Sequence, residues 1–335
     1  MKKYLCYAGI DVSKSKLDVT FVRDALQKQS NHFIVTNNRS GIQQLLKRLG
    51  KQKNDLKDVL ISFEDTGVYS LPLACYLSEK QLDYWMIPAI EIKRSKGISR
   101  GKTDKSDSKD IAFYSLTHLH KLKLSSIPEK EIMELKLLFT EREKVMKAIL
   151  LLQSTQECVG YIPAAVMKSV IKINAAAIKQ LQKALLKIET AMQQIIKAND
   201  YLQQQYNLIN SIPGIGTHTA TYLMIVTKGF QSFDNWRQLA CYAGVAPFEY
   251  SSGSSIRGRT KVNHLADKKL KSLLNLCALN AKKHDHQLKE YYIKKVAEGK
   301  AKMLVLNNIR CKLLSRVFAV INRQTPYINT YKFAA

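Results

Sequence analysis

The first 125 residues alternate between short strand-like and helix-like segments in an order that few folds satisfy. Three strand-like runs come first, and a helix, a strand, a helix, a strand and a helix follow them. The expected strands lie at residues 4–12, 16–23, 32–35, 59–63 and 83–88, and the expected helices lie at 40–49, 69–81 and 106–119. The close succession of the first three runs predicts an antiparallel meander. The complete order predicts an α/β fold, in which a mixed sheet packs against helices.

Apolar residues spaced alternately three and four apart mark the middle of the chain, over residues 126–209. They are Ile178, Leu181, Leu185, Ile188, Met192, Ile195, Leu202 and Ile209. This spacing is typical of a coiled-coil seam, with Asn199 and Tyr206 at two further core positions. An earlier helix over about 129–153 and a break at 160–163 predict an antiparallel helical hairpin. A two-helix spacer and a dimerising arm both satisfy this pattern.

The last part of the chain, residues 210–335, is expected to form a mostly helical domain. Its final helical stretch, roughly residues 264–322, is rich in Lys and Arg. A chain of 335 residues is longer than one core usually serves. The changes of pattern therefore predict three domains, at residues 1–125, 126–209 and 210–335.

The charge of the chain indicates a polyanionic partner. It has 53 basic and 27 acidic residues, which give a formal net charge of +26. Nucleic acid neutralises such an excess through phosphate contacts, and DNA or RNA is therefore the expected partner. An anionic membrane is the alternative, but the basic residues are spread along the chain and do not gather beside an amphipathic anchor. The absence of a long apolar run and of a signal-peptide pattern favours a cytoplasmic protein with no membrane contact.

Four acidic residues stand where this α/β fold would bring them together. Asp11 ends the first expected strand and Glu64 ends the fourth. Asp104 and Asp107 stand three residues apart at the expected start of a helix, and so lie on one helical face. Four clustered carboxylates repel one another unless cations neutralise them, and Mg²⁺ prefers oxygen ligands. Two such ions could clamp the attacking and leaving oxygens of a phosphodiester.

Each of these acidic residues alone has a plainer explanation. A single Asp at a strand end is more often a cap or turn residue, and Asp104 could cap its own helix. Asp18, Asp65 and Asp110 are competing candidates for the same role. The joint order of meander, helix, strand, helix, strand and acidic helix start is more specific. It resembles the ribonuclease-H-like fold of Holliday-junction resolvases.

A segment rich in serine, glycine and arginine lies at residues 239–261. Its polar members are Ser251, Ser252, Ser254 and Ser255 around Gly253, followed by Arg257, Arg259 and Lys261. A serine hydroxyl becomes a good nucleophile only when a base or a metal ion removes its proton. Guanidinium groups bind phosphate oxygens and stabilise the charge of a transition state. The segment is therefore a candidate nucleophile loop, although such a loop more often binds phosphate alone.

The segment Ser211–Gly216 resembles the turn of a helix-hairpin-helix motif. The amides of Gly214 and Gly216, together with the start of the next helix, can bind a DNA phosphate. A tight turn between packed helices is an equally good explanation.

The order of these motifs resembles one family, the DEDD-motif transposases of bacterial insertion sequences, also described as bridge-RNA-guided serine recombinases. The matching motifs are Gly9-Ile10-Asp11, Phe63-Glu64-Asp65-Thr66-Gly67, Lys102-Thr103-Asp104-Lys105-Ser106-Asp107, Ile212-Pro213-Gly214-Ile215-Gly216, and Tyr242-Ala243-Gly244 with Pro247 and Ser252-Gly253. The resemblance covers nearly the whole chain. Asp65 departs from the small residue that often follows the glutamate in this family.

The resemblance implies a RuvC-like N-terminal domain with an RNase-H fold, a coiled-coil insertion and a C-terminal transposase domain. It assigns Mg²⁺, for which Mn²⁺ is a possible substitute, to Asp11, Glu64, Asp104 and Asp107. Ser252 matches the nucleophile, with Ser251 as its neighbouring rival. The residues expected to contact nucleic acid are Lys102, Gly214, Gly216, Arg257, Arg259 and Lys261. The family also implies donor and target DNA, a structured guide (bridge) RNA, and dimers that pair into tetramers.

The expected reaction is a transesterification of DNA. Mg²⁺ held by the four acidic residues activates Ser252, which attacks the scissile phosphate and forms a covalent phosphoserine link. That link preserves the bond energy, so the strands can be rejoined without ATP. Two alternatives remain open. One is a metal-dependent Holliday-junction endonuclease in which water attacks, and the other is a non-catalytic nucleic-acid-binding protein in which the carboxylates are caps.

Overall fold

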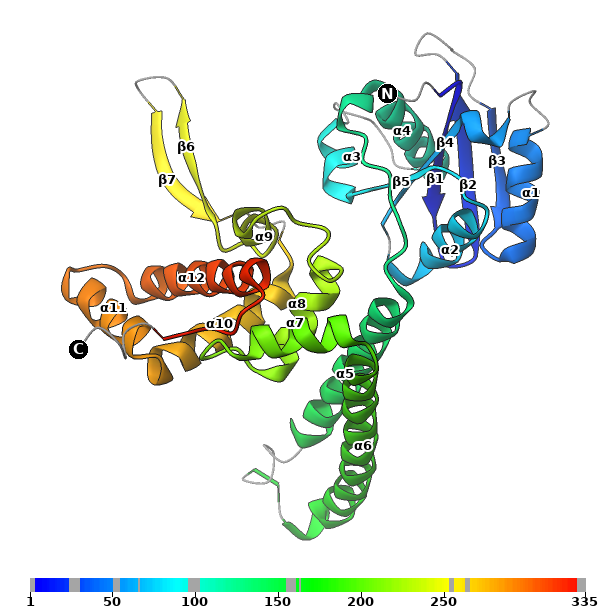
Figure 1. The fold of residues 1–335 in the computed structure, drawn as a ribbon. Helices are drawn as coiled ribbons and strands as arrows, with labels where there is room; N and C mark the ends of the chain where they lie inside the picture. Colours follow the sequence, from blue (N-terminus) through cyan, green and yellow to red (C-terminus); the bar gives the residue numbers. More distant parts are fainter. Residues whose placement is uncertain are drawn as a thin grey trace. The chain divides into compact units, whose positions relative to one another are not determined.

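A computed structural model of the chain describes residues 4–23, 31–50, 55–65, 67–95, 103–154, 161–162, 164–252, 256–262 and 266–329. The chain divides into two compact units, Met1–Ile127 and Pro128–Ala335 (Figure 1). Each unit buries apolar side chains of its own.

A five-stranded mixed sheet forms the centre of the first unit. Its strands are β1 (Cys6–Val12), β2 (Lys16–Val22), β3 (Asn31–Thr36), β4 (Val59–Glu64) and β5 (Tyr84–Ile87), in the spatial order β3-β2-β1-β4-β5. The first three strands pair antiparallel, whereas β4 runs parallel to β1 and β5 runs parallel to β4 (Figure 1). The meander and the mixed sheet that the sequence predicts are confirmed.

Helices cover both faces of this sheet. The helices of the first unit are α1 (Arg39–Gly50), α2 (Leu71–Glu79), α3 (Ala89–Ser95) and α4 (Asp104–Thr117), with 3-10 turns at Leu56–Asp58, Gly67–Tyr69 and Leu119–Lys121. Helices α1 and α2 share one core with Ile10 and Phe63 of the sheet. Helix α4 packs against the opposite face, where Tyr114 contacts Trp85. The short helix α3 was not expected from the sequence.

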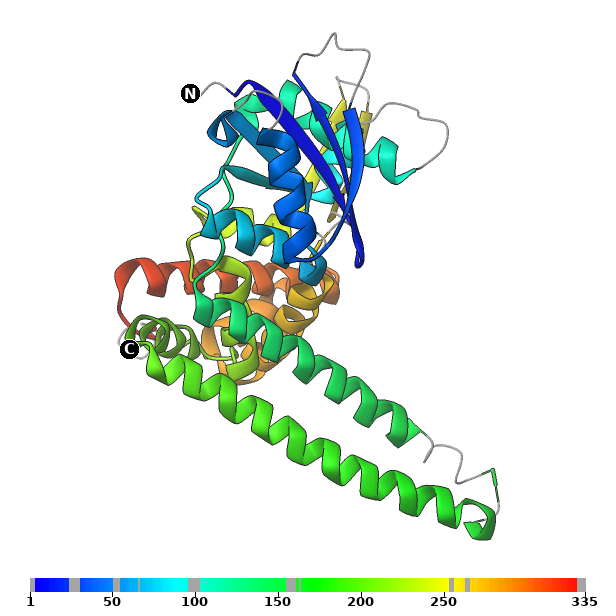
Figure 2. The same ribbon diagram turned by 90° about the vertical axis from the view of Figure 1, so that its right-hand side faces the viewer.

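The second unit is helical apart from one hairpin of strands. Its elements are α5 (Lys130–Ser154), α6 (Ala164–Ala198), α7 (Asp200–Asn210), α8 (Thr217–Thr227), α9 (Trp236–Tyr242), β6 (Pro247–Ser252), β7 (Ile256–Val262), α10 (Lys268–His284), α11 (His286–Ala297) and α12 (Lys302–Arg323). The long helices α5 and α6 lie side by side, as Figure 2 shows. Phe139 of α5 and Met192 of α6 belong to the same core as the helices from α7 to α12.

The heptad pattern across Asn199 is interrupted in the structure, which corrects the sequence-based expectation. Helix α6 ends at Ala198, and Asn199 is the N-cap of α7, where its side chain accepts a hydrogen bond of 3.1 Å from the amide of Leu202. Asparagine favours this position because its side-chain oxygen satisfies an amide that the helix leaves unpaired. Asn199 is therefore a helix cap and not a core position of one continuous seam.

The serine-rich segment is also more regular than the loop that the sequence suggested. Residues 247–252 and 256–262 form the antiparallel strands β6 and β7, which extend from the helical body of the second unit (Figure 1). Gly253, Ser254 and Ser255, between the two strands, lie outside the described residues. Among the helices that the structure describes, none has both the length and the apolar character needed to cross a bilayer.

Candidate active site

Close packing between Gly9 and α4 determines where the acidic residues of the first unit meet. A Cβ at Gly9 would lie 2.2 Å from the backbone nitrogen of Ala112 and 2.3 Å from the carbonyl oxygen of Ser108. Only glycine therefore lets α4 approach β1 this closely. The Ser108 hydroxyl is also 2.8 Å from that of Thr20 on β2, and both residues are fully buried. Because side chains alternate along a strand, Asp11 lies on the same face of β1 as Gly9, the face that α4 covers.

The four predicted acidic residues come from three neighbouring elements. Asp11 lies near the end of β1, and Glu64 is the last residue of β4, the parallel strand beside it. Asp104 and Asp107 lie in the first turn of α4. A capping box fixes the start of that helix, because the Thr103 hydroxyl accepts from the Ser106 amide at 3.1 Å and the Ser106 hydroxyl accepts from the Thr103 amide at 3.0 Å.

The electrostatics of Asp11 reflect these neighbours. Burial is the largest cause that raises the pKa of the Asp11 carboxyl, from 3.8 to about 6. Four nearby negative charges raise this pKa further, in decreasing order those of Asp104, Asp107, Asp18 and Glu64. A bound cation would oppose both effects, because it favours the ionised carboxylate.

Asp18 joins this acidic group, and sequence reasoning had treated it only as a competing candidate. Asp18 of β2 is paired directly with Asp11 of β1, and it is only 3% exposed. Its carboxylate accepts from Lys16 at 3.0 Å and lies 3.2 Å from the Nε2 atom of His32. The sequence could have predicted this pairing. The short turn before Lys16–Val22 and the alternation of that strand fix the register, and so fix which residue of β2 lies opposite Asp11.

Lys16 links this buried carboxylate to the metal-ligand candidates. Its Nζ atom lies 2.7 Å from the Asp104 carboxylate, and the two neighbouring carboxylates of Asp104 and Asp18 raise the pKa of the ammonium group. Sequence reasoning missed Lys16. The Lys16 ammonium group therefore already neutralises part of the negative charge that a bound metal ion would otherwise neutralise.

The acidic residues suit a hard divalent cation in their chemistry. Asp11, Glu64, Asp104 and Asp107 supply only carboxylate oxygens, which are the ligands that Mg²⁺ prefers. Within the described ranges, no three His, Cys, Asp or Glu side chains already converge as a set of metal ligands. The Asp104 carboxylate contacts the Lys16 ammonium group at 2.7 Å. In chemical character, the carboxylate oxygens of the four residues fit a divalent cation such as Mg²⁺.

Asp65 has a structural role. Its carboxylate accepts hydrogen bonds from the amide of Gly67 at 3.1 Å and from the hydroxyl of Ser70 at 3.4 Å. It thereby stabilises the turn that follows β4. Its position next to Glu64 therefore has an explanation apart from metal binding.

The candidate nucleophile lies in the second unit, on the hairpin of β6 and β7. Ser252 is the last residue of β6 and is paired with Ile256, whereas Ser251 is paired with Arg257. Arg259 and Lys261 lie further along β7, and Lys261 is paired with Phe248. Lys102, predicted to contact nucleic acid, lies outside the described residues.

The glycines of the predicted helix-hairpin-helix turn have different surroundings. Gly214 has a φ of +95°, which favours glycine, and a Cβ there would lie 2.6 Å from the Cβ of Ala281 on α10, so backbone conformation and helix packing explain this glycine. Gly216 is the exposed N-cap of α8, and a Cβ there would meet no atom within 4 Å. Its amide contacts the buried thiol of Cys277, whose pKa burial raises.

Comparison with known proteins adds evidence from the whole sequence. Residues 8–155 match a family model of DEDD transposases described as "Transposase", and residues 206–293 match the model "Transposase IS116/IS110/IS902 family". The two matches together span more than half of the chain.

Curated relatives agree with these matches. The chain is 26% identical to the "Pilin gene-inverting protein" of Moraxella lacunata and to that of Moraxella bovis, in each case over 96% of this chain and 97% of the relative. It is 32% identical to the "Insertion element IS110 uncharacterized 43.6 kDa protein" of Streptomyces coelicolor, over 36% of this chain and 29% of that protein. The acidic group and the order of the motifs agree with these matches. The chain belongs to the IS110 family and is a DNA transposase.

Proposed function

We propose that this transposase cuts and rejoins DNA by attack of Ser252 on the scissile phosphate, at a site completed by Asp11, Glu64, Asp104 and Asp107. The placement of the four carboxylates carries the proposal, because Asp11 and Glu64 lie at the ends of neighbouring parallel strands, and Asp104 and Asp107 begin the helix that packs closely on β1 at Gly9. The first unit would then be a RuvC-like catalytic domain with an RNase-H fold. The acidic residues and Ser252 belong to different units, and DNA binding would bring them to one phosphate.

Magnesium, for which manganese could substitute, would be held by the four carboxylates. When bound, it would polarise the phosphate and lower the pKa of a hydroxyl beside it. Asp11 and Glu64 would hold it from the strand side and Asp104 and Asp107 from the helix side. Lys16, displaced from Asp104, would carry its positive charge toward the phosphate oxygens.

The chemical step conserves the number of phosphoester bonds. The Ser252 hydroxyl loses its proton to a base, and its oxygen forms a bond to phosphorus. The bond between phosphorus and one bridging sugar oxygen breaks, and that oxygen takes up a proton and leaves as a hydroxyl group. A sugar hydroxyl of another strand then attacks the phosphoserine, which restores a DNA phosphodiester and frees Ser252. Arg257, Arg259 and Lys261 would stabilise the added negative charge.

Rejoining separates this proposal from the nuclease alternative. The relatives that match over 96% of this chain are named for inverting a gene. Inversion requires that cut strands be joined again, which hydrolysis by water does not achieve. This observation favours serine transesterification over a metal-dependent Holliday-junction endonuclease. It also disfavours a protein that only binds nucleic acid.

A guide RNA and an oligomer complete the proposed machinery. The resemblance to bridge-RNA-guided recombinases supports recognition of donor and target DNA through a structured RNA. The far end of the α5–α6 hairpin supports self-association, because it exposes several apolar side chains: Leu150, Leu151, Val166, Val170 and Ile173. Such a patch on a helical arm is typical of a protein interface. We propose that this coiled-coil arm forms a dimer and that dimers pair into tetramers.

A strand-exchange assay tests the proposed function. Purified protein is incubated with Mg²⁺, donor and target DNA and the RNA encoded by its own element, and recombinant junctions are amplified and sequenced. Junctions should form with the unaltered protein and disappear with Ser252→Ala, while Ser251→Ala, the neighbouring control, retains them. Asp107→Asn should also abolish them. Full strand exchange by Ser252→Ala would contradict the proposal.

A further inference from the structure

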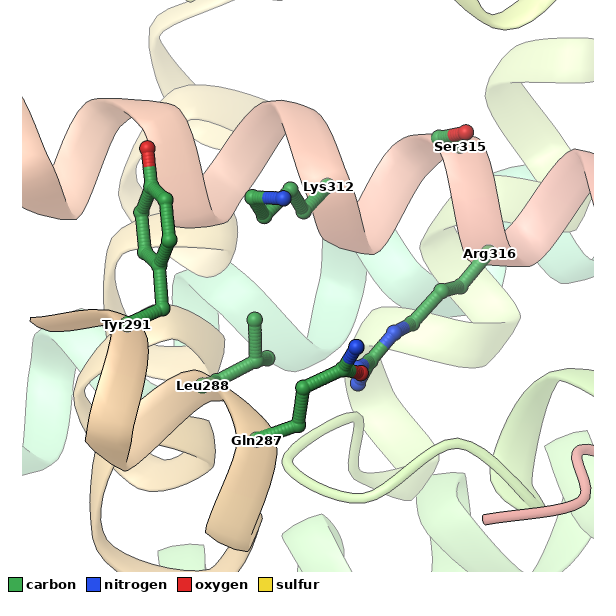
Figure 3. Close-up of a pocket in the computed structure, with 6 residues that line it drawn as sticks. All are labelled: Gln287, Leu288, Tyr291, Lys312, Ser315 and Arg316. Carbon is green, nitrogen blue, oxygen red and sulfur yellow. The ribbon is translucent and has the colours of Figure 1, made fainter. Parts of the chain in front are cut away.

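A small basic pocket lies between α11 and α12, away from the β6–β7 hairpin in the sequence and partly beyond the segment that matches the transposase family. It has a volume of about 270 Å³ and is lined by Gln287, Leu288, Tyr291, Lys312, Ser315 and Arg316 (Figure 3). Three of these residues come from α12, and the other three come from α11. Pockets for drug-sized ligands measure roughly 300–1,000 Å³, so this one suits a group as small as a phosphate with part of its sugar.

Arg316 is held in place by a buried carboxylate. Its Nη1 atom donates to Asp285 at 2.7 Å, and the Asp285 side chain is fully buried. Its Nη2 atom donates to Gln287, whose amide meets the guanidinium in Figure 3, and the ring of Tyr327 lies 4.7 Å from the guanidinium carbon. These contacts use two of the five donors of the guanidinium and fix its orientation before any ligand arrives.

Lys312 supplies a positive charge that no carboxylate in the described part of the chain neutralises. Its Nζ atom lies 4.6 Å from the centre of the Tyr291 ring, a cation–π contact. The Tyr291 hydroxyl in turn accepts from the Asn308 amide at 3.3 Å, so the ring that supports Lys312 is itself fixed. An aromatic ring places the ammonium group without cancelling its charge.

The surroundings of the pocket favour an anion over a neutral ligand. Helix α12 carries five basic residues and no acidic one. On the neighbouring helix, Asp285 is paired with Arg316 at 2.7 Å, and the Glu290 carboxylate lies 3.6 Å from the His286 ring. Gln287, which contacts the Arg316 guanidinium, and Ser315 add neutral polar groups to the lining of the pocket. Lys312, with a charge that no carboxylate among the described residues neutralises, and the guanidinium donors of Arg316 that its contacts leave unused can both bind the oxygens of one phosphate.

We propose that this pocket binds a phosphate group of a nucleic-acid backbone, and so anchors DNA or RNA through residues other than those of the acidic group and the serine hairpin. The identification of the ligand as nucleic acid rests on the proposed function. Binding itself needs neither metal nor strand cutting, so it can be tested when catalysis is absent.

The experiment measures binding by the full-length protein in EDTA, using fluorescence anisotropy with labelled duplex DNA and labelled single-stranded RNA. Lys312→Gln should weaken binding by about 5- to 10-fold at 0.1 M salt, and it should reduce the slope of log K against log salt by about 0.9 on duplex DNA or about 0.7 on single strands. Lys302→Gln, the matched control, removes the same charge from an exposed position of the same helix outside the pocket and should change neither quantity.

A second pair of variants tests the pocket itself. Ser315→Glu places a negative charge among the lining residues, whereas Ser315→Gln has nearly the same size without the charge. The Glu variant should bind at least tenfold more weakly than the Gln variant, with equal Tm values. An effect on DNA alone, on RNA alone or on both identifies the source of the phosphate. Equal binding by the two Ser315 variants, or equal losses in Lys302→Gln and Lys312→Gln, would overturn the inference, whatever the outcome with Ser252.

Discussion

Asp11 and Asp18 lie directly opposite each other on β1 and β2, so that two carboxylates share one face of the sheet. Like charges in such a pair destabilise a sheet unless other groups compensate for them. Asp18 is compensated by Lys16 at 3.0 Å and by the His32 ring at 3.2 Å. At Asp11, burial first and then the charges of neighbouring acidic residues raise the pKa of the carboxyl to about 6. A bound metal ion would relieve the repulsion that the neighbouring carboxylates exert on Asp11.

This repulsion predicts that Asp11→Asn stabilises the metal-free protein. The folded state raises the pKa of Asp11, so this group favours folding only while it is protonated, and that contribution is lost as the pH rises through about 6. The full shift corresponds to at most about 3 kcal/mol, which solvent screening reduces to about 1 kcal/mol. At pH 7.5 in EDTA, Asp11→Asn should raise Tm by about 3 °C.

The control for this prediction is Glu79→Gln, which alters an exposed carboxylate paired with Arg39 at the surface. Its Tm should stay within about 1 °C of the unaltered protein. Added Mg²⁺ should raise the Tm of the unaltered protein but not that of Asp11→Asn. A lower Tm for Asp11→Asn in EDTA would contradict the proposed repulsion.

Divalent cation binding should depend on pH in the same region. Below about 6 the Asp11 carboxyl is protonated and competes with the ion, and above it the carboxylate is available. Mn²⁺ affinity measured by titration calorimetry should therefore rise between pH 5.5 and pH 7.5, with release of protons on binding. Proton release is read from the dependence of the heat on the ionisation enthalpy of the buffer. Affinity independent of pH would contradict a role for Asp11 as a ligand.

Lys16→Gln should strengthen divalent cation binding. The ammonium group of Lys16 occupies the Asp104 carboxylate at 2.7 Å, and its charge opposes a second cation nearby. Its removal should raise Mn²⁺ affinity by about tenfold. Lys14→Gln, which alters the exposed lysine two residues earlier, should leave the affinity unchanged. Weaker binding by Lys16→Gln than by Lys14→Gln would show instead that Lys16 organises the ligands.

Gly9→Ala should disrupt the acidic group through packing. The new methyl group would meet backbone atoms of α4 at 2.2 and 2.3 Å, which no side-chain rotation can relieve. We expect a loss of at least about 3 kcal/mol in the free energy of unfolding, from overpacking that displaces α4. Gly50→Ala is the matched control, because a Cβ there meets nothing within 4 Å. Equal urea midpoints for the two variants would contradict the role given to Gly9.

Local patterns were enough to predict the sheet and the strand ends and helix start on which the four acidic residues stand, because apolar runs and strand ends are properties of short segments. The role of Lys16 was missed, since it depends on the register of β1 and β2 and on the rotamer of a long side chain. The break at Asn199 was missed because apolar spacing continues across it from Ile195 to Leu202, seven residues apart. The β6–β7 hairpin was missed because serine, glycine and arginine have weak strand preferences, and cross-strand pairing supplies the order.

Trapping of a covalent protein–DNA adduct tests the central claim most directly. End-labelled donor and target DNA is incubated with the protein, Mg²⁺ and the RNA encoded by its own element, and the mixture is denatured and separated by electrophoresis. We predict a slowly migrating adduct that protease removes, that Ser251→Ala retains and that Ser252→Ala abolishes, with a phosphorylated Ser252 peptide identified by mass spectrometry. Cleaved DNA without an adduct, in amounts that Ser252→Ala does not change, would contradict the account and identify water as the nucleophile.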